Sequence, residues 1–138
     1  MGGVFVCNLA LAGMRLLVME DEVLIAMDVE QLCRDHGAVE VVLVHALGAW
    51  GSQEGLESGF DAAILDVALA GDSTLPFAAK LAAADVPFIF ATGHTEAEEL
   101  FAAFPGVAVI GKPYDESALI EALGQAIAGK NKPTSQGV

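Results

Sequence analysis

Short apolar runs alternate with segments of helical character along most of the chain. Apolar residues dominate five runs of four to six residues, which is typical of strands buried on both faces of a sheet. In the segments that follow them, apolar residues recur at helical spacing or alanine dominates, and glycine often ends the segment. The predicted strands are 15–19, 39–44, 62–65, 87–91 and 107–110, and the predicted helices are 23–36, 47–57, 75–84, 95–104 and 115–128.

This alternation predicts one α/β domain, a doubly wound parallel five-stranded sheet with helices on both faces. Right-handed crossovers leave few arrangements, and the expected strand order is 2-1-3-4-5. The domain is predicted to occupy residues 14–129. Residues 1–13 are expected to be an N-terminal extension and residues 130–138 a flexible C-terminal tail.

Composition narrows the classes of partner. Six Lys and Arg residues stand against nineteen Asp and Glu residues, which gives a net charge of −13. This charge argues against direct binding to nucleic acid or to an anionic membrane surface, and it favours a cation such as Mg2+ or a protein with a basic face. The chain is 54% hydrophobic, yet no run reaches the ~18 apolar residues of a membrane span.

The cysteines and the first residues indicate a compartment. Cys7 and Cys33 are too few for a disulfide framework, and Cys33 falls within a helical pattern where a buried thiol is expected. Residues 1–13 are apolar but contain no basic n-region, so a secretory signal is a poor match. These features predict a protein of the reducing cytoplasm.

Acidic residues end two strands that neighbour each other in the predicted sheet. Glu20 and Asp21 follow the first strand, and Asp66 follows the third. Carboxyl ends of parallel strands share one edge of the sheet, with backbones ~4.8 Å apart. Carboxylates that close repel each other by about 4 kcal/mol per pair at 4 Å and an effective dielectric near 20. Mg2+ is the predicted counter-charge because it prefers oxygen ligands.

Two further polar residues are predicted to reach the same edge. Thr92 ends the fourth strand, and Lys112 follows the fifth. The Lys112 side chain can cover most of the two strand spacings that separate it from Asp66. A carboxylate with a divalent cation, an ammonium and a hydroxyl around it is arranged to receive a phosphoryl group, because phosphoryl transfer depends mainly on charge stabilisation.

Four motifs at these strand ends resemble those of the receiver domains of bacterial two-component response regulators, the CheY-like family, over residues 14–129. The motifs are LLVMEDE, AILDV, FATG and GKPY, in the family's order. The resemblance implies a flavodoxin-like (βα)5 fold and a phosphoryl group accepted on Asp66 from a histidine kinase or phosphotransfer protein. It also implies that any catalysis is confined to the protein's own phosphorylation and dephosphorylation.

The resemblance assigns roles around Asp66. Asp21 and Asp66 would ligate Mg2+, Glu20 would act through water, and the backbone carbonyl of Ala68 would be a further metal contact. A cis peptide bond before Pro113 is implied as well. The signal would pass to an unknown downstream protein through protein contacts, and a homodimer is left open.

The stretch PFIFATGH is closer to the single-domain FATGUY regulators, some of which act in phosphorelays of the general stress response. The resemblance therefore predicts a stand-alone response regulator. His94 departs from the aromatic residue usual after the motif and is a candidate modulator of access to Asp66. Val109 stands where receivers carry a switching aromatic residue, and Ala70 stands where proline is common. Signal transmission is therefore expected to take another route, through Thr92 and the loop after it.

Simpler interpretations of the same residues stay open. Asp66 could be a turn residue, Thr92 could satisfy a strand end, and Lys112 could be a solvated loop lysine. A phosphatase of the haloacid dehalogenase class uses a second acid two residues after its nucleophile, where this chain has Ala68. The main alternative function is a receiver-like adaptor that binds a partner without phosphorylation.

Overall fold

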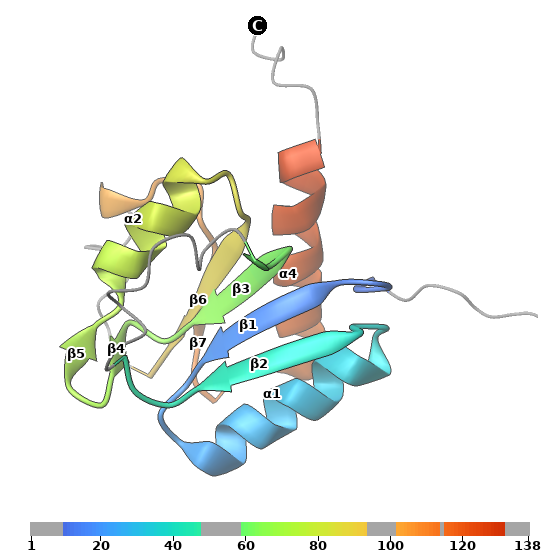
Figure 1. Ribbon diagram of the computed structural model, residues 1–138, viewed down its shortest axis with the longest axis horizontal. Helices are drawn as coiled ribbons and strands as arrows, with labels where there is room; N and C mark the ends of the chain where they lie inside the picture. The colour runs from blue at the N-terminus through green and yellow to red at the C-terminus, as the bar shows by residue number, and fades with distance from the viewer. Residues whose placement is uncertain (1–9, 48–58, 94–101, 114, 132–138) are drawn as a thin grey trace, which may run out of the picture.

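The computed structural model describes residues 10–47, 59–93, 102–113 and 115–131 (Figure 1). One five-stranded parallel sheet has the order β2-β1-β3-β6-β7, which confirms the predicted 2-1-3-4-5 order. Its strands are β1 (Arg15–Met19), β2 (Glu40–Val44), β3 (Ala62–Leu65), β6 (Phe88–Thr92) and β7 (Val109–Gly111). Helices α1 (Val23–Asp35), α2 (Leu75–Ala83) and α4 (Glu116–Asn131) lie within the described residues.

Successive residues of each central strand face opposite layers, as side chains in a strand must. In β1, Leu16 and Val18 belong to the core cluster that includes α1 and α4. Leu17 and Met19 belong to the second cluster, which includes α2. The sheet is therefore covered on both faces, with α1 and α4 on one and α2 on the other (Figure 1), as the continuous apolar runs predicted.

Residues just before β1 pack on the domain. Leu11 is fully buried in the cluster of α1 and α4, and its N–H donates to the carbonyl of His36 at 2.9 Å. The Gly13 N–H donates to the carbonyl of Gly37 at 3.0 Å. The end of the expected N-terminal extension thus contributes a side chain to the core.

Several element ends differ from the predicted ones. β6 and β7 each reach one residue further toward the carboxyl edge, where the Lys112 N–H donates to the carbonyl of Thr92 at 2.9 Å. α4 continues past Gly129 to Asn131, because a glycine costs a helix only about 1 kcal/mol relative to alanine. Of the other predicted helices, 47–57 lies almost wholly, and 95–104 mostly, outside the described residues.

A small hairpin, absent from the predicted elements, follows β3. It pairs β4 (Ala68–Leu69) with β5 (Asp72–Ser73) in antiparallel register. Its two turn residues both have positive φ, 53° at Ala70 and 91° at Gly71, as a type I′ turn requires. The hairpin lies at the carboxyl edge of the sheet (Figure 1).

None of the helices in the described part of the chain is long and apolar enough to cross a membrane.

Candidate functional site

Strand register sets the position of the acidic residues. Met19 of β1 pairs with Leu65 of β3, so the next residues, Glu20 and Asp66, leave adjacent strands at the same level. The Asp66 N–H donates to the carbonyl of Met19 at 2.9 Å, and the Glu20 N–H donates to the carbonyl of Val44 at 3.0 Å. Both acids are therefore anchored to the sheet through their backbones.

The structure brings three predicted metal-ligating residues together. Carboxylate oxygens of Glu20, Asp21 and Asp66 lie within 4.8 Å of one another. Glu20 and Asp66 are only 4% and 8% exposed, whereas Asp21 is exposed. Ligands of one octahedral Mg2+ at ~2.1 Å lie about 3 to 4 Å apart, so small side-chain movements or one bridging water would fit the cluster to an ion. The cluster could therefore hold a metal ion.

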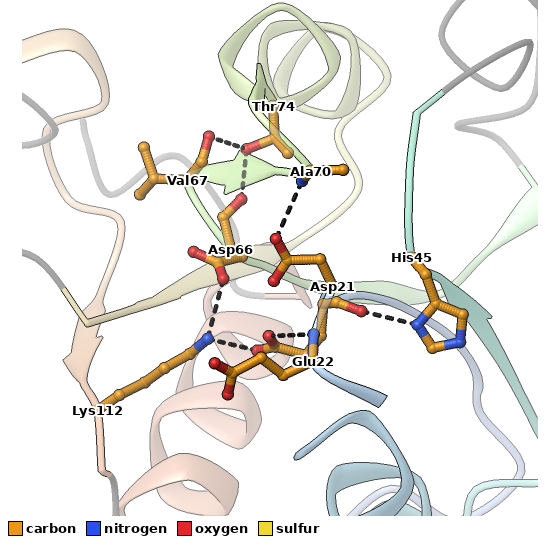
Figure 2. A network of polar contacts seen from close by, with 9 residues as sticks. Asp21, Glu22, His45, Asp66, Val67, Ala70, Thr74 and Lys112 are labelled. Atoms are coloured by element: carbon orange, nitrogen blue, oxygen red, sulfur yellow. Dashed lines mark hydrogen bonds and ion pairs between the residues drawn. The ribbon is translucent and has the colours of Figure 1, made fainter. Parts of the chain in front are cut away.

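Lys112 supplies the positive charge that the cluster needs. From the end of β7 its Nζ donates to Glu20 Oε1 and, at 2.9 Å, to Asp66 Oδ2 (Figure 2). The Lys112 side chain is 13% exposed, and those of its two partners are 5% and 11% exposed. The side chain thus spans the gap between β7 and β3 that its length was predicted to cover.

Burial and pairing act in opposite directions on these groups. Burial raises the pKa of the Glu20 carboxyl above its ordinary value, although hydrogen bonds from Lys112 and from the Glu22 N–H pull it down. Burial alone would lower the pKa of the Lys112 ammonium. Its hydrogen bonds to Glu20 and Asp66 outweigh that effect, so the pKa of Lys112 lies above its ordinary value. The ammonium is therefore held in its charged form.

An open pocket of about 550 Å³ lies over these groups. Asp66 and Lys112 line it together with Ala68 of β4, the predicted carbonyl ligand. Thr92 is 1% exposed at the end of β6, paired in register with Gly111 of β7. Thr92 does not line the pocket, whose remaining lining residues are Asp21, Glu22, Ile25, Gly93 and Pro113.

The family resemblance also implied a cis peptide bond before Pro113 and drew attention to His94. The peptide bond between Lys112 and Pro113 is cis, as the motif GKPY implied. His94, the candidate modulator of access, lies outside the described residues.

Polar contacts that three further residues make at the site were missed by sequence reasoning. The Ala70 N–H, at the tip of the hairpin, donates to Asp21 Oδ2 at 3.0 Å. A ring nitrogen of His45, Nδ1, lies 2.9 Å from the carbonyl oxygen of Glu20. The hydroxyl of Thr74 donates to the carbonyls of Asp66 and Val67 (Figure 2). Two of these residues carry a local signal: a threonine before Leu75 and Pro76 is typical of a helix start, and His45 directly follows the predicted strand 39–44.

No protein-family model and no curated protein matches the sequence. Solved structures do match. The receiver (REC) domain of the response regulator PhyR from Erythrobacter litoralis is 26% identical, with a TM-score of 0.72 over 90% of this chain and 97% of that one. A response regulator receiver protein from Sinorhizobium medicae is 24% identical, with a TM-score of 0.73 over 86% of this chain and 97% of that one. The chain has the fold of a receiver domain of the CheY-like type.

Longer proteins also contain this receiver domain fold. The anti-anti-sigma factor PhyR from Bartonella quintana matches at 21% identity and a TM-score of 0.69, over 91% of this chain and 52% of that one. The chain thus spans about half the length of the full PhyR proteins that it matches. At this identity the likeness establishes the fold of the receiver domain alone.

Proposed function

We propose that this receiver domain accepts a phosphoryl group on Asp66 in a Mg2+-dependent reaction and passes the signal on through protein contacts. One observation carries the proposal. Three carboxylates lie within 4.8 Å of one another at the carboxyl edge of the sheet, and Lys112 is ion-paired to two of them. A turn aspartate and a solvated lysine, taken separately, would have no reason to converge in this way.

The charge of the cluster suits one divalent ion. Three ionised carboxylates and one ammonium leave a net charge of −2, which a single Mg2+ would neutralise. Asp21, Asp66 and the carbonyl of Ala68 would hold the ion, with Glu20 acting through water. When bound, the ion would stabilise negative charge on the oxygens of the transferred phosphoryl group.

The chemical step is an in-line displacement at phosphorus. One carboxylate oxygen of Asp66 attacks the phosphoryl group of a phosphohistidine. The P–N bond breaks, and its electron pair leaves with the imidazole, so an acyl phosphate forms on Asp66. The Lys112 ammonium, which donates to Asp66 Oδ2 at 2.9 Å, would hold the carboxylate in place and offset charge on the phosphoryl oxygens. The Thr92 hydroxyl would donate a hydrogen bond to one of those oxygens.

The nature of the partners follows from this chemistry and from the charge. The phosphodonor would be a histidine kinase or phosphotransfer protein, and the receiver of the signal a further protein, because a net charge of −13 disfavours nucleic acid. Two of the matching PhyR structures are those of a stress response regulator and of an anti-anti-sigma factor. A part in the general stress response is the role that this similarity supports, and the cytoplasm is the compartment that the sequence predicts.

The proposal is tested by intact mass after incubation with acetyl phosphate and Mg2+. The wild type is expected to gain the mass of one phosphoryl group, and Asp66→Asn is expected to gain none. Asp72→Asn is the matched control, because Asp72 is an exposed aspartate of the nearby hairpin. Chelation of the metal with EDTA should abolish labelling of the wild type.

The adaptor alternative makes the opposite prediction. A wild type that takes no phosphate from acetyl phosphate or from a phosphorylated donor protein, and an Asp66→Asn variant that binds its partner normally, would replace the phosphoacceptor proposal with the adaptor.

A further inference from the structure

We infer that Thr74 is a positioning residue for this site. Its hydroxyl closes the base of the β4–β5 hairpin, and the hairpin sets the direction of Asp66 and Asp21. The inference rests on the proposed function, since it concerns the same metal and phosphoryl site.

Thr74 ties the chain beyond Asp66 back to itself. Thr74 is completely buried, and its Oγ1 lies 2.5 Å from the carbonyl oxygen of Asp66 and 3.0 Å from that of Val67. Its backbone N–H donates to the same Val67 carbonyl at 2.9 Å. The peptide planes on both sides of Val67 are therefore fixed by one residue, because buried carbonyls without partners are costly.

The loop closed in this way carries two groups of the site. Ala68, in β4, lines the pocket and is the predicted carbonyl ligand. At the tip of the hairpin, the Ala70 N–H donates to Asp21 Oδ2 at 3.0 Å. Figure 2 shows the order of contacts, from Thr74 to the backbone of Asp66 on one side and from Ala70 to Asp21 on the other. A shift at the base of the hairpin would therefore reach both candidate ligands.

The hydroxyl of Thr74 does not serve the helix that it precedes. Thr74 occupies the N-cap position of α2, where a threonine normally accepts a hydrogen bond from the first turn, but its side chain makes no such bond. The Leu75 N–H is instead satisfied by Ser73 Oγ at 3.1 Å. The Thr74 hydroxyl is directed to the peptide of Asp66, which favours a role in the site over a role in starting the helix.

The test compares Thr74→Val with Thr74→Ser. Valine keeps the shape of threonine but has no donor, whereas serine keeps the donor. We expect Thr74→Val to bind Mn2+, used as a probe for the metal and measured as free Mn2+ by electron paramagnetic resonance, about 10-fold or more weakly than wild type. Labelling by acetyl phosphate should slow in parallel. Thr74→Ser should restore both properties to near the wild-type level.

Ser73→Ala is the matched control. It removes the bond to the first turn of α2 and leaves the carbonyls of Asp66 and Val67 untouched. It should lower stability in urea without changing Mn2+ affinity. In the metal-free protein, hydrogen exchange of the Ala70 amide should accelerate in Thr74→Val and stay unchanged in Ser73→Ala, which gives a readout that needs no metal.

The outcomes separate the inference from the proposed function. If wild type binds Mn2+ and is labelled but Thr74→Val does both equally well, the positioning role is wrong and the proposed function stands. Equal losses in Thr74→Val and Ser73→Ala, or no recovery in Thr74→Ser, overturn the role as well. A wild type that neither binds Mn2+ nor is labelled removes both. If Thr74→Val does not fold, Thr74→Cys, with its weaker donor, takes its place with the same expectations in direction.

Discussion

At the scale of single residues, the neighbourhood of a polar group decides what it can do. Lys112 touches two carboxylates and keeps its charge, so it offsets part of the negative charge of Glu20 and Asp66. Cys33 has the opposite environment. It is completely buried in the cluster of α1 and α4, and burial raises the pKa of its thiol to about 12. A thiol of this kind is inert in the folded protein, since only the thiolate is nucleophilic.

Cys33 is therefore expected to resist alkylation in the native state. In a Cys7→Ser background, where Cys33 is the only cysteine, iodoacetamide at pH 8 should modify the protein far more slowly than it does in concentrated urea. A folded pKa of about 12 leaves roughly one molecule in 10⁴ as thiolate at that pH, against about a quarter for an ordinary thiol of pKa ~8.5. Mass spectrometry over time measures both rates.

The raised pKa of Cys33 also makes the stability of the fold depend on pH. The unfolded thiol loses its proton near pH 8.5 and the folded one near 12, so the contribution of Cys33 to stability is complete below about pH 8 and is lost as pH rises between the two values. Equal alkylation rates in native buffer and in urea would contradict the burial of this side chain.

At the scale of elements, the end of α2 contains a residue with a strained backbone conformation. The Asp85 N–H donates to the carbonyl of Ala82 at 3.1 Å, and the Val86 N–H donates to that of Leu81 at 2.9 Å, which is a Schellman motif. This motif puts its first residue after the helix in the left-handed region, and Asp85 has φ of 64°. Glycine is the usual residue there because a Cβ is strained at positive φ.

Asp85→Gly is therefore expected to stabilise the protein. The gain should be about 1 kcal/mol in the free energy of unfolding, measured by urea titration. Asp85→Ala is the control, because it also removes one negative charge from a chain of net charge −13 but keeps the Cβ. A similar gain in both variants would show that charge, and not backbone strain, limits stability at this position.

The sequence predicted the strands of the fold better than its turns. Strands 15–19 and 62–65 were located correctly because apolar runs of this length have few alternatives in an α/β pattern. The hairpin after β3 was missed because Ala70, a residue with no turn preference, adopts a φ of 53°. Propensity cannot reveal a turn that tertiary contacts impose.

Candidate site residues divide in the same way. The convergence of Asp66 and Lys112 was predictable, because strand order and strand ends alone bring them to one edge. The contacts of His45 with Glu20 and of Ala70 with Asp21 were not, because they depend on the direction of a histidine ring and of a hairpin amide, which strand order does not set. Periodicity reports the strand that carries a residue, but not its partner across the fold.

At the scale of the whole molecule, the proposed function requires a phosphodonor protein to approach Asp66 through the pocket. Asp66 is 8% exposed, so a phosphohistidine can reach it only if the donor covers the rim of the pocket. Glu22 and Ile25 form part of that rim beside the first turns of α1. Three large apolar side chains are exposed there, namely Val23 (52%), Leu24 (78%) and Met27 (54%). Exposed apolar side chains that lie together are uncommon and often mark a site of protein contact. We therefore expect the donor to bury this end of α1.

Leu24→Glu should accordingly weaken phosphotransfer from a donor protein without changing the chemistry at Asp66. Burial of a leucine is worth about 2 kcal/mol, so kcat/KM for transfer should fall by about 10-fold or more, while the rate of labelling by acetyl phosphate stays at the wild-type level. Val39→Glu is the matched control, because Val39 is 62% exposed but precedes β2 at the opposite edge of the sheet. Both variants add the same charge, so an equal effect of the two would point to net repulsion between donor and receiver. A loss confined to Leu24→Glu would place the donor on α1, and unchanged transfer in Leu24→Glu would exclude that surface.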